Sequence, residues 1–200
     1  MNLLIHLVFG LGIFHLAVNA AEVTEPSTQL AFPTVVQVLD QGKEVPLQLT
    51  GIAVRSKFFV NVYALAHYMQ DPAKFSQAAV FDEILRNRKI KQFVLKWVHD
   101  VDLKSIREAY LTGFQKSLSA DEQLHAKKAI DTYLALYTSG AKVGDVHILR
   151  WFPDGIVTLT INDQPIGKIT DPLFAKGLWG IWFNPKSVVS RNKLVKNLLD

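Results

Sequence analysis

The chain has 200 residues, with 22 Lys and Arg against 18 Asp and Glu, and 49% of its residues are apolar. This length suits one domain, and the apolar content is too high for a disordered chain. The absence of cysteine excludes a disulfide framework, a thiolate metal site and a cysteine nucleophile. The net charge of +4 permits contact with an anionic surface, but a nucleic-acid-binding protein of this size concentrates its basic residues more strongly.

The first twenty residues have the composition of a secretory signal peptide. All charged side chains follow Ala20, and residues 3–17 form an apolar run interrupted only by Gly and His. The run ends in Val18-Asn19-Ala20, with small residues where a signal peptidase reads, and it is too short for a membrane span of about 20 residues. We therefore expect cleavage after Ala20 and a periplasmic or secreted protein, with an uncleaved N-terminal anchor as the alternative.

The first part of the remaining chain has the composition of β-structure. Residues 21–33 contain two prolines and several small polar residues, which predicts a flexible leader or an edge segment. Three stretches rich in β-branched and aromatic residues follow, at 34–38, 45–49 and 52–69. Asp71-Pro72 is a typical helix start and predicts a helix to about Arg88. Residues 89–98 then alternate as a strand does.

Two helices and a second β-rich region follow. Asp102 caps a predicted helix with apolar residues at three- and four-residue steps, and the capping box Ser119-Ala-Asp-Glu122 opens the next helix. Three strands are predicted at 145–152, 156–161 and 165–169, separated by tight turns. A helix starting at Asp171-Pro172 and a short one after Ser190 complete the chain. Strands joined by tight turns make an antiparallel sheet, so the predicted class is α+β, in one domain spanning 34–200.

Three segments together resemble the chalcone isomerase-like family, in its bacterial secreted branch. They are residues 49–68 (LTGIAVRSKFFVNVYALAHY), Gly144-Asp145 with the stretch 151–162 (WFPDGIVTLTIN), and residues 174–182 (FAKGLWGIW). They occur in the family's order and span nearly all of the chain after residue 34. The resemblance implies an open-faced sandwich, in which helices are layered on one face of a large antiparallel sheet.

The resemblance also bears on catalysis. The plant enzymes of the family cyclise a phenolic substrate with an arginine, a threonine-bearing strand, a helix tyrosine and further polar residues. Arg55 matches the arginine, but Tyr63 stands where the threonine is expected, and residues 102–113 show no aligned phenol. Gly180-Ile181 replace the substrate-contacting pair. The pattern is similar to that of the fatty-acid-binding relatives, in which an arginine and a tyrosine hold a carboxylate.

Arg55 and Tyr63 are therefore the first candidates for a ligand site. A guanidinium grips a carboxylate with two parallel hydrogen bonds, and a phenol adds a third donor. On one straight strand these two residues would lie about 26 Å apart. A turn near Ser56-Lys57 is needed to bring them together, and the alternative is that both are ordinary sheet residues.

Lys57 and Lys96 are further candidates. Lys57 would add positive potential at the mouth of a cleft, unless it is simply an exposed turn residue. Lys96 stands within an apolar strand and would act in the cleft if desolvated, or else lies on the solvent side of the sheet. The scattered histidines show no metal-ligand spacing, and we expect no metal and no cofactor. The basic residues Arg86, Arg88, Lys89 and Lys91 offer peripheral contact with an anionic membrane, or form a solvated helix end.

Three functions remain open. The first is a secreted, non-catalytic protein that binds a fatty acid or another amphipathic carboxylate between sheet and helices. The second is an isomerase or lyase acting on an α,β-unsaturated carbonyl, with Arg55 stabilising the anion and Tyr63 or Lys96 as the acid–base partner. The third is an envelope interaction protein without a small ligand. The sequence names neither the oligomeric state nor a protein partner.

Overall fold

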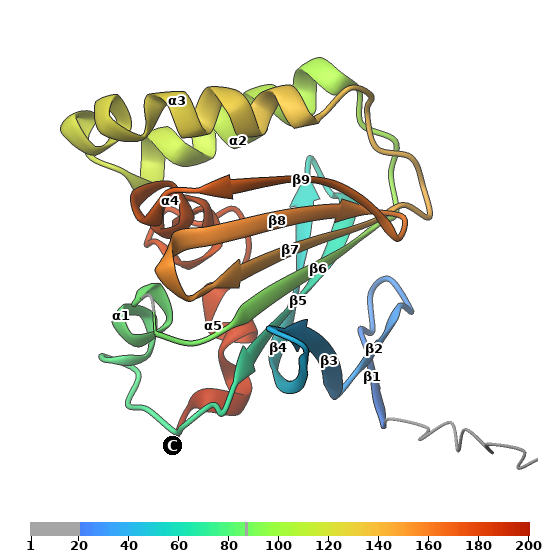
Figure 1. Cartoon of the computed structure of the whole chain (residues 1–200). Helices are drawn as coiled ribbons and strands as arrows, with labels where there is room; N and C mark the ends of the chain where they lie inside the picture. The colour runs from blue at the N-terminus through green and yellow to red at the C-terminus, as the bar shows by residue number, and fades with distance from the viewer. Residues whose placement is uncertain (1–20, 87) are drawn as a thin grey trace, which may run out of the picture.

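The computed structural model describes residues 21–86 and 88–200, so the expected signal peptide lies outside the described residues. The core of the fold is a curled seven-stranded antiparallel sheet in which each strand pairs with the next along the chain (Figure 1). Its strands are β3 (Val35–Asp40), β4 (Lys43–Lys57), β5 (Val60–Gln70), β6 (Lys91–Trp97), β7 (Val146–Phe152), β8 (Ile156–Ile161) and β9 (Gln164–Thr170). This confirms the predicted α+β class and the antiparallel sheet.

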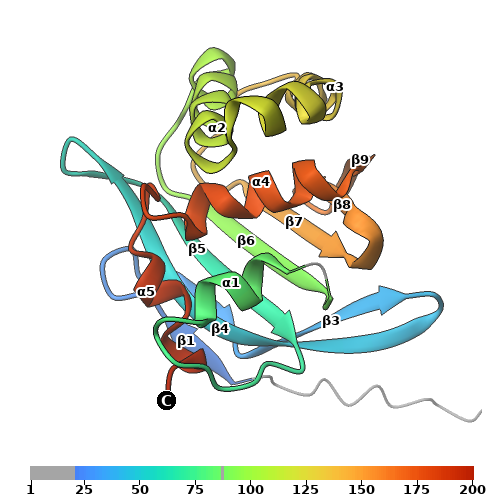
Figure 2. The ribbon, with the colours of Figure 1, turned by 90° about the vertical axis from the view of Figure 1, so that its left-hand side faces the viewer.

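The helices lie on one face of this sheet, as Figure 2 shows. They are α1 (Val80–Leu85), α2 (Leu103–Ser117), α3 (Ala120–Leu136), α4 (Pro172–Phe183) and α5 (Arg191–Leu194), with short 3₁₀ helices at Pro153–Gly155 and Lys196–Leu198. Aromatic side chains of α4 pack on the sheet: Phe93 of β6 lies 4.7 Å from Trp182 and 5.0 Å from Trp179, between ring centroids. No helix in the described ranges is long and apolar enough to cross a membrane.

The other face of the sheet carries a smaller hydrophobic cluster. In this region the structure differs from the sequence-based prediction. The segment expected to be either a flexible leader or an edge segment forms a hairpin of β1 (Glu22–Thr24) and β2 (Ala31–Pro33). Phe32 is fully buried against this face, and the Tyr68 hydroxyl donates a hydrogen bond to the Pro33 carbonyl at 3.0 Å. The hairpin therefore forms because its apolar side chain covers the sheet.

A second correction concerns the helix predicted from Asp71-Pro72. Among the described residues of this range, 71–86 and 88, only 80–85 are helical, and Asp71 has a positive φ of 38°. The Phe75 amide instead donates to the Leu198 carbonyl at 2.7 Å, in a parallel bridge between Phe75 and Leu199. Pairing with the C-terminal segment thus displaces the first helical turns that the local signal predicted.

Candidate functional site

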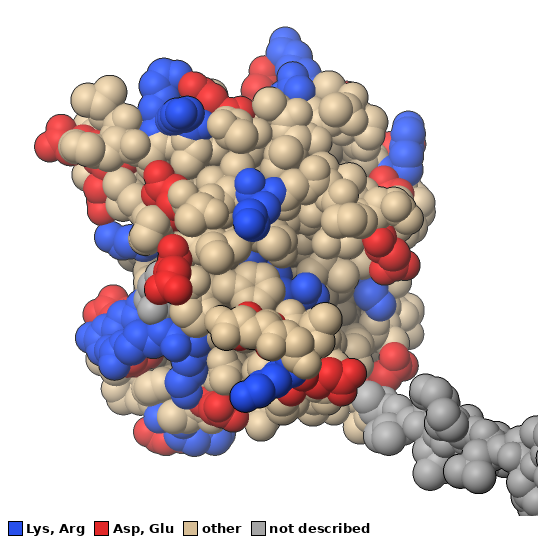
Figure 3. Space-filling model, viewed as in Figure 1, with Lys and Arg blue, Asp and Glu red and all other residues tan. Residues whose placement is uncertain are grey.

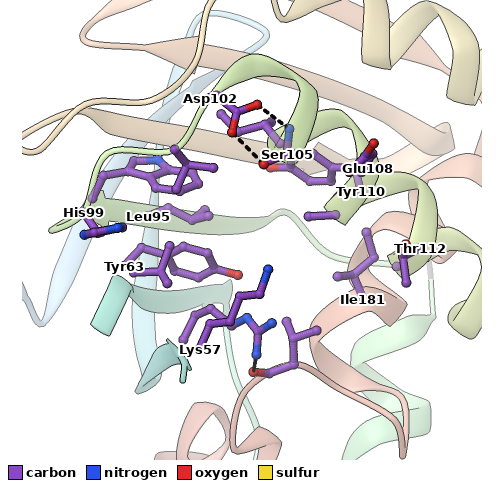
Figure 4. Close-up of a pocket in the computed structure, with 18 of the residues that line it drawn as sticks. Lys57, Tyr63, Leu95, His99, Asp102, Ser105, Glu108, Tyr110, Thr112 and Ile181 are labelled. Carbon is purple, nitrogen blue, oxygen red and sulfur yellow. Dashed lines mark hydrogen bonds between the residues drawn. The ribbon is translucent and has the colours of Figure 1, made fainter. Parts of the chain in front are cut away.

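A pocket of about 620 Å³ lies between the β4–β5 hairpin, α2 and the C-terminal end of α4 (Figure 4). This volume falls within the range of small-molecule sites. Its walls are mainly apolar side chains from the sheet and both helices, including Val62, Leu95, Trp97, Ile106, Ile181 and Trp182. Apolar walls of this size suit a hydrocarbon chain, because they replace its contact with water.

The β4–β5 hairpin brings the first two candidate residues together. Its two-residue turn is at Phe58-Phe59, two positions later than the turn expected near Ser56-Lys57. Arg55 and Tyr63 then face each other as cross-strand partners, where Cβ atoms lie about 4.5–5.5 Å apart. The separation expected for a straight strand is therefore removed by the turn, and both residues line the pocket.

Arg55 is half-buried at the edge of the pocket and is only partly hydrogen-bonded. Its Nη1 donates to the Ser56 carbonyl at 3.0 Å and to the Val188 carbonyl at 3.2 Å. Within the described part of the chain, its Nε and Nη2 have no hydrogen-bond partner, and no carboxylate lies within ion-pair distance. The guanidinium is held in place by two backbone carbonyls and keeps donors available for a ligand.

Tyr63 is buried, and its hydroxyl points into the pocket (Figure 4). That oxygen accepts a hydrogen bond from Nε1 of Trp182 at 3.0 Å. Burial raises the pKa of Tyr63, and so the phenol stays protonated at neutral pH. No described group accepts its proton, which leaves the phenol as a donor oriented by Trp182.

Lys57 lies at the end of β4 and also lines the pocket, where Figure 4 shows its side chain extending beside Tyr63. It is exposed and makes no ion pair with a described residue. The carboxylates on the α2 side differ, because each has a partner. Asp102 accepts from the amide and the hydroxyl of Ser105 at 2.9 and 2.7 Å, and Asp100 pairs with Lys142 at 2.9 Å. Among the described residues, the pocket's cations without an acidic partner are therefore Arg55 and Lys57 on the β4 side and Lys116 on α2.

Lys96 does not belong to this site, which corrects the sequence-based expectation. Tyr63 pairs with Trp97, so Trp97 shares the pocket face of the sheet and its neighbour Lys96 points to the other face. There Nζ donates to the Ala31 carbonyl at 2.6 Å and lies 4.8 Å from the centre of the Phe32 ring. Lys96 thus holds the β1–β2 hairpin against the sheet.

Several of the basic side chains at the end of α1 and after it are already paired or buried. Figure 3 shows basic side chains gathered near α1, at the lower left. Arg86 pairs with Glu83, and Arg88 lies 3.9 Å from the same carboxylate. Lys91 is fully buried, donates to the Arg86 carbonyl at 2.6 Å and lies 3.7 Å from the Trp151 ring. This cluster therefore offers an anionic surface fewer free charges than expected.

Two residues of the pocket were missed from the sequence. Trp182 is one of several aromatic residues that suit either the lining of a pocket or, by default, the core, and nothing in its spacing shows that it would orient Tyr63. Tyr110 lies in the stretch expected to lack an aligned phenol, yet it lines the pocket and its hydroxyl accepts from Tyr137 at 2.9 Å. The one signal in the sequence was its place among the apolar residues of the predicted helix, which indicated that Tyr110 faces the sheet. The described residues contain no group of three His, Asp or Glu that would hold a metal ion.

Comparison with known proteins agrees with this architecture. Residues 28–200 match a family model described as chalcone isomerase-like. Among solved structures, a fatty-acid binding protein from Arabidopsis thaliana superposes with a TM-score of 0.73 at 15% sequence identity, covering 89% of this chain and 97% of that one. No curated protein sequence matches the chain. At this identity the superposition establishes the shared fold.

Proposed function

The chain belongs to the chalcone isomerase-like family, and we propose that its pocket binds a fatty acid or another amphipathic carboxylate without transforming it. The observation that carries the proposal is a pair of donors for which the described residues supply no acceptor. They are the free side of the Arg55 guanidinium and the Tyr63 hydroxyl, and both lie in an apolar pocket. The similar plant structure is that of a fatty-acid binding protein.

The charge distribution supports a carboxylate in particular. Arg55 and Lys57 lack acidic partners among the described residues, whereas Asp100 and Asp102 on the opposite wall are already hydrogen-bonded. A carboxylate would complete the hydrogen bonding of Arg55 and Tyr63, and its chain would lie along Leu95, Trp97 and Ile181. An uncharged ligand would leave the guanidinium unpaired.

Substitution of Arg55 tests the proposal. Arg55→Ala removes hydrogen bonds to a charged group, worth about 1.5–3 kcal/mol, and should raise the Kd for a long-chain fatty acid by about 10- to 150-fold. The measurement is titration calorimetry with a soluble fatty acid. Lys96→Ala is the matched control, because it removes a cation on the opposite face of the sheet. Equal affinity of Arg55→Ala and the parent would contradict the proposal.

One observation favours a second candidate, an isomerase or lyase acting on an α,β-unsaturated carbonyl. Tyr110 places a second phenol in the pocket that contains Arg55 and Tyr63. Burial raises the pKa of Tyr110, so it would act as a hydrogen-bond donor to a developing anion. Absorbance changes with chalcones and other unsaturated ketones test this reaction, and a rate equal to the uncatalysed one would exclude it for those substrates.

We also propose that residues 1–20 direct the protein to the periplasm or the exterior. The support is their uncharged, apolar composition ending in Val18-Asn19-Ala20. The test is the mass and N-terminal sequence of protein recovered from the cell envelope, where the mature chain should begin at Ala21. Recovery of the intact chain from the cytoplasm would contradict it.

A further inference from the structure

The tip of the β4–β5 hairpin exposes two adjacent phenylalanines. Phe58 has 84% of its surface exposed and Phe59 is exposed to 105% of its reference value. Figure 2 shows this hairpin extending beyond the body of the fold, at the upper left. Val60, the next residue, is 46% exposed, so the tip carries three apolar side chains in a row. Contiguous exposed apolar surface marks interaction sites more often than isolated residues do.

The backbone gives no reason for phenylalanine at this turn. Both residues have positive φ, 49° for Phe58 and 67° for Phe59, a conformation that large side chains disfavour and Gly, Asn and Asp tolerate. The other tight turns of the same sheet, at Gln41-Gly42, Asp154-Gly155 and Asn162-Asp163, use Gly, Asn or Asp at every positive-φ position except Gln41, and none of them uses an aromatic residue. Neither Phe58 nor Phe59 packs into a described hydrophobic core. Their rings therefore serve neither the turn nor the core.

We propose that Phe58 and Phe59 insert into the interface of a lipid bilayer and hold the mouth of the pocket against it. The tip and the pocket are continuous, because Lys57, Phe58 and Val60 belong to both. Lys57 lies beside the rings without an acidic partner among the described residues, with Nζ 5.7 Å from the Phe58 ring centre. With the rings at the apex and the cation at their base, the rings would reach the hydrocarbon of an anionic bilayer while Lys57 contacts the negatively charged headgroups above it.

The small size of the tip favours a bilayer over a second copy of the chain. A stable protein interface buries about 800 Å² on each partner, whereas a phenylalanine buries about 150–250 Å². Two such rings fall well short of a dimer interface. A bilayer needs no complementary protein surface, and a few inserted side chains with nearby cations are sufficient for peripheral binding.

The inference rests on the proposed function in one respect, that the docked pocket would take its fatty acid from the bilayer. The docking itself is measured without any fatty acid. Phe59 is the residue to alter, because it is exposed and does not line the pocket. The native tryptophans are at most 6% exposed, so a tryptophan at the tip gives a separate signal.

The experiment uses the full chain with Phe59→Trp and vesicles of brominated phosphatidylcholine and phosphatidylglycerol. Insertion predicts a blue shift and severalfold quenching of the added tryptophan by the bromolipid. The matched control is Leu124→Trp, at a 71% exposed apolar position on α3. Its fluorescence should not change, even where residues 1–20 attach the chain to the vesicle. Phe59→Gly removes the ring and suits the turn conformation, so this variant should bind the vesicles severalfold more weakly than the parent chain.

Each outcome decides the inference. Quenching at position 59 but not at 124 supports docking through the hairpin. Quenching at both positions, or at neither, overturns it. A blue shift that depends on protein concentration without vesicles means that a second copy covers the tip, and this also overturns it. The proposed function is measured separately: if the parent binds no fatty acid in solution while position 59 is quenched, the ligand proposal fails and the docking surface remains.

Discussion

At the scale of single residues, the site depends on how each polar group is already hydrogen-bonded. The Tyr63 hydroxyl accepts from Trp182 and keeps its own proton available. Arg55 is fixed by two backbone carbonyls through one nitrogen, which leaves the rest of the guanidinium available. Among the described residues each side chain is therefore oriented by the protein and incompletely hydrogen-bonded, and the proposed carboxylate ligand would complete its hydrogen bonding.

Replacement of Tyr63 tests this account. Tyr63→Phe keeps the ring but removes the phenol donor, worth about 1.5–3 kcal/mol toward a carboxylate. Its Kd for a fatty acid should rise at least tenfold, as measured by calorimetry. Tyr133→Phe is the control, because it removes a buried phenol that does not line the pocket. If both variants weaken binding equally, the effect is one of general packing and the assigned role of Tyr63 is wrong.

At the scale of elements, local signals were reliable where no distant segment competes. The predicted cap of α2 and the capping box of α3 both form, with the Ser119 amide donating to Glu122 at 2.8 Å and the Glu122 amide donating to Ser119 at 3.2 Å. The signal at Asp71-Pro72 was wrong, because Phe75 pairs with the C-terminal segment. The same segment also crosses β4, where Thr50 donates to the Leu194 carbonyl at 2.7 Å.

This crossing explains why glycine stands at position 51. A Cβ there would lie 2.0 Å from the Lys193 carbonyl oxygen and 2.8 Å from that of Leu194. Gly51→Ala should therefore displace α5 from β4 and lower the free energy of unfolding by about 1–3 kcal/mol, as measured in urea. Ser56→Ala, an exposed position on the same strand, should change stability little. A Gly51→Ala variant as stable as the parent would show that the close approach is not required.

At the scale of the whole molecule, the fold keeps two histidines away from water. His67 donates from Nδ1 to Thr50 at 2.7 Å and its Nε2 accepts from Trp179 at 3.3 Å, an arrangement that requires a neutral ring. Burial lowers the pKa of His67 well below its usual value and lowers the pKa of His147 to about 4. Both rings must gain a charge on unfolding at mildly acidic pH.

The dependence of stability on pH follows from these shifts. Because the folded-state pKa values lie below the unfolded value of about 6.5, the unfolded chain binds more protons, and stability falls as pH falls below that value. His147 alone contributes a loss on the order of 3 kcal/mol between pH 6.5 and 4, and His67 adds to it. Thermal unfolding should show a Tm that falls steadily from pH 7 to pH 5.

Substitution isolates the contribution of His147. His147→Leu removes its titration and should reduce the pH dependence in this window, leaving the part that His67 contributes, while His125→Leu, at an exposed position, should not reduce it. Carboxylates of lowered pKa, such as Asp145, become protonated below pH 5, so they do not contribute to the change in Tm between pH 7 and pH 5. A parent Tm that is constant from pH 7 to pH 5 would contradict the assignment of two neutral buried histidines.

The sequence by itself determined the α+β class, the antiparallel order of the strands, most turns and helix caps, and the candidates Arg55 and Tyr63. The class, the turns and the caps depend on local backbone preferences and side-chain patterns, whereas the two candidate residues come from the resemblance to the chalcone isomerase-like family. Only the tertiary structure decided that Arg55 and Tyr63 are cross-strand partners, that Lys96 lies on the opposite face, and that Trp182 and Tyr110 enter the pocket. Strand register and helix placement set these relations, and a shift of one residue would turn each side chain to the other face of the sheet.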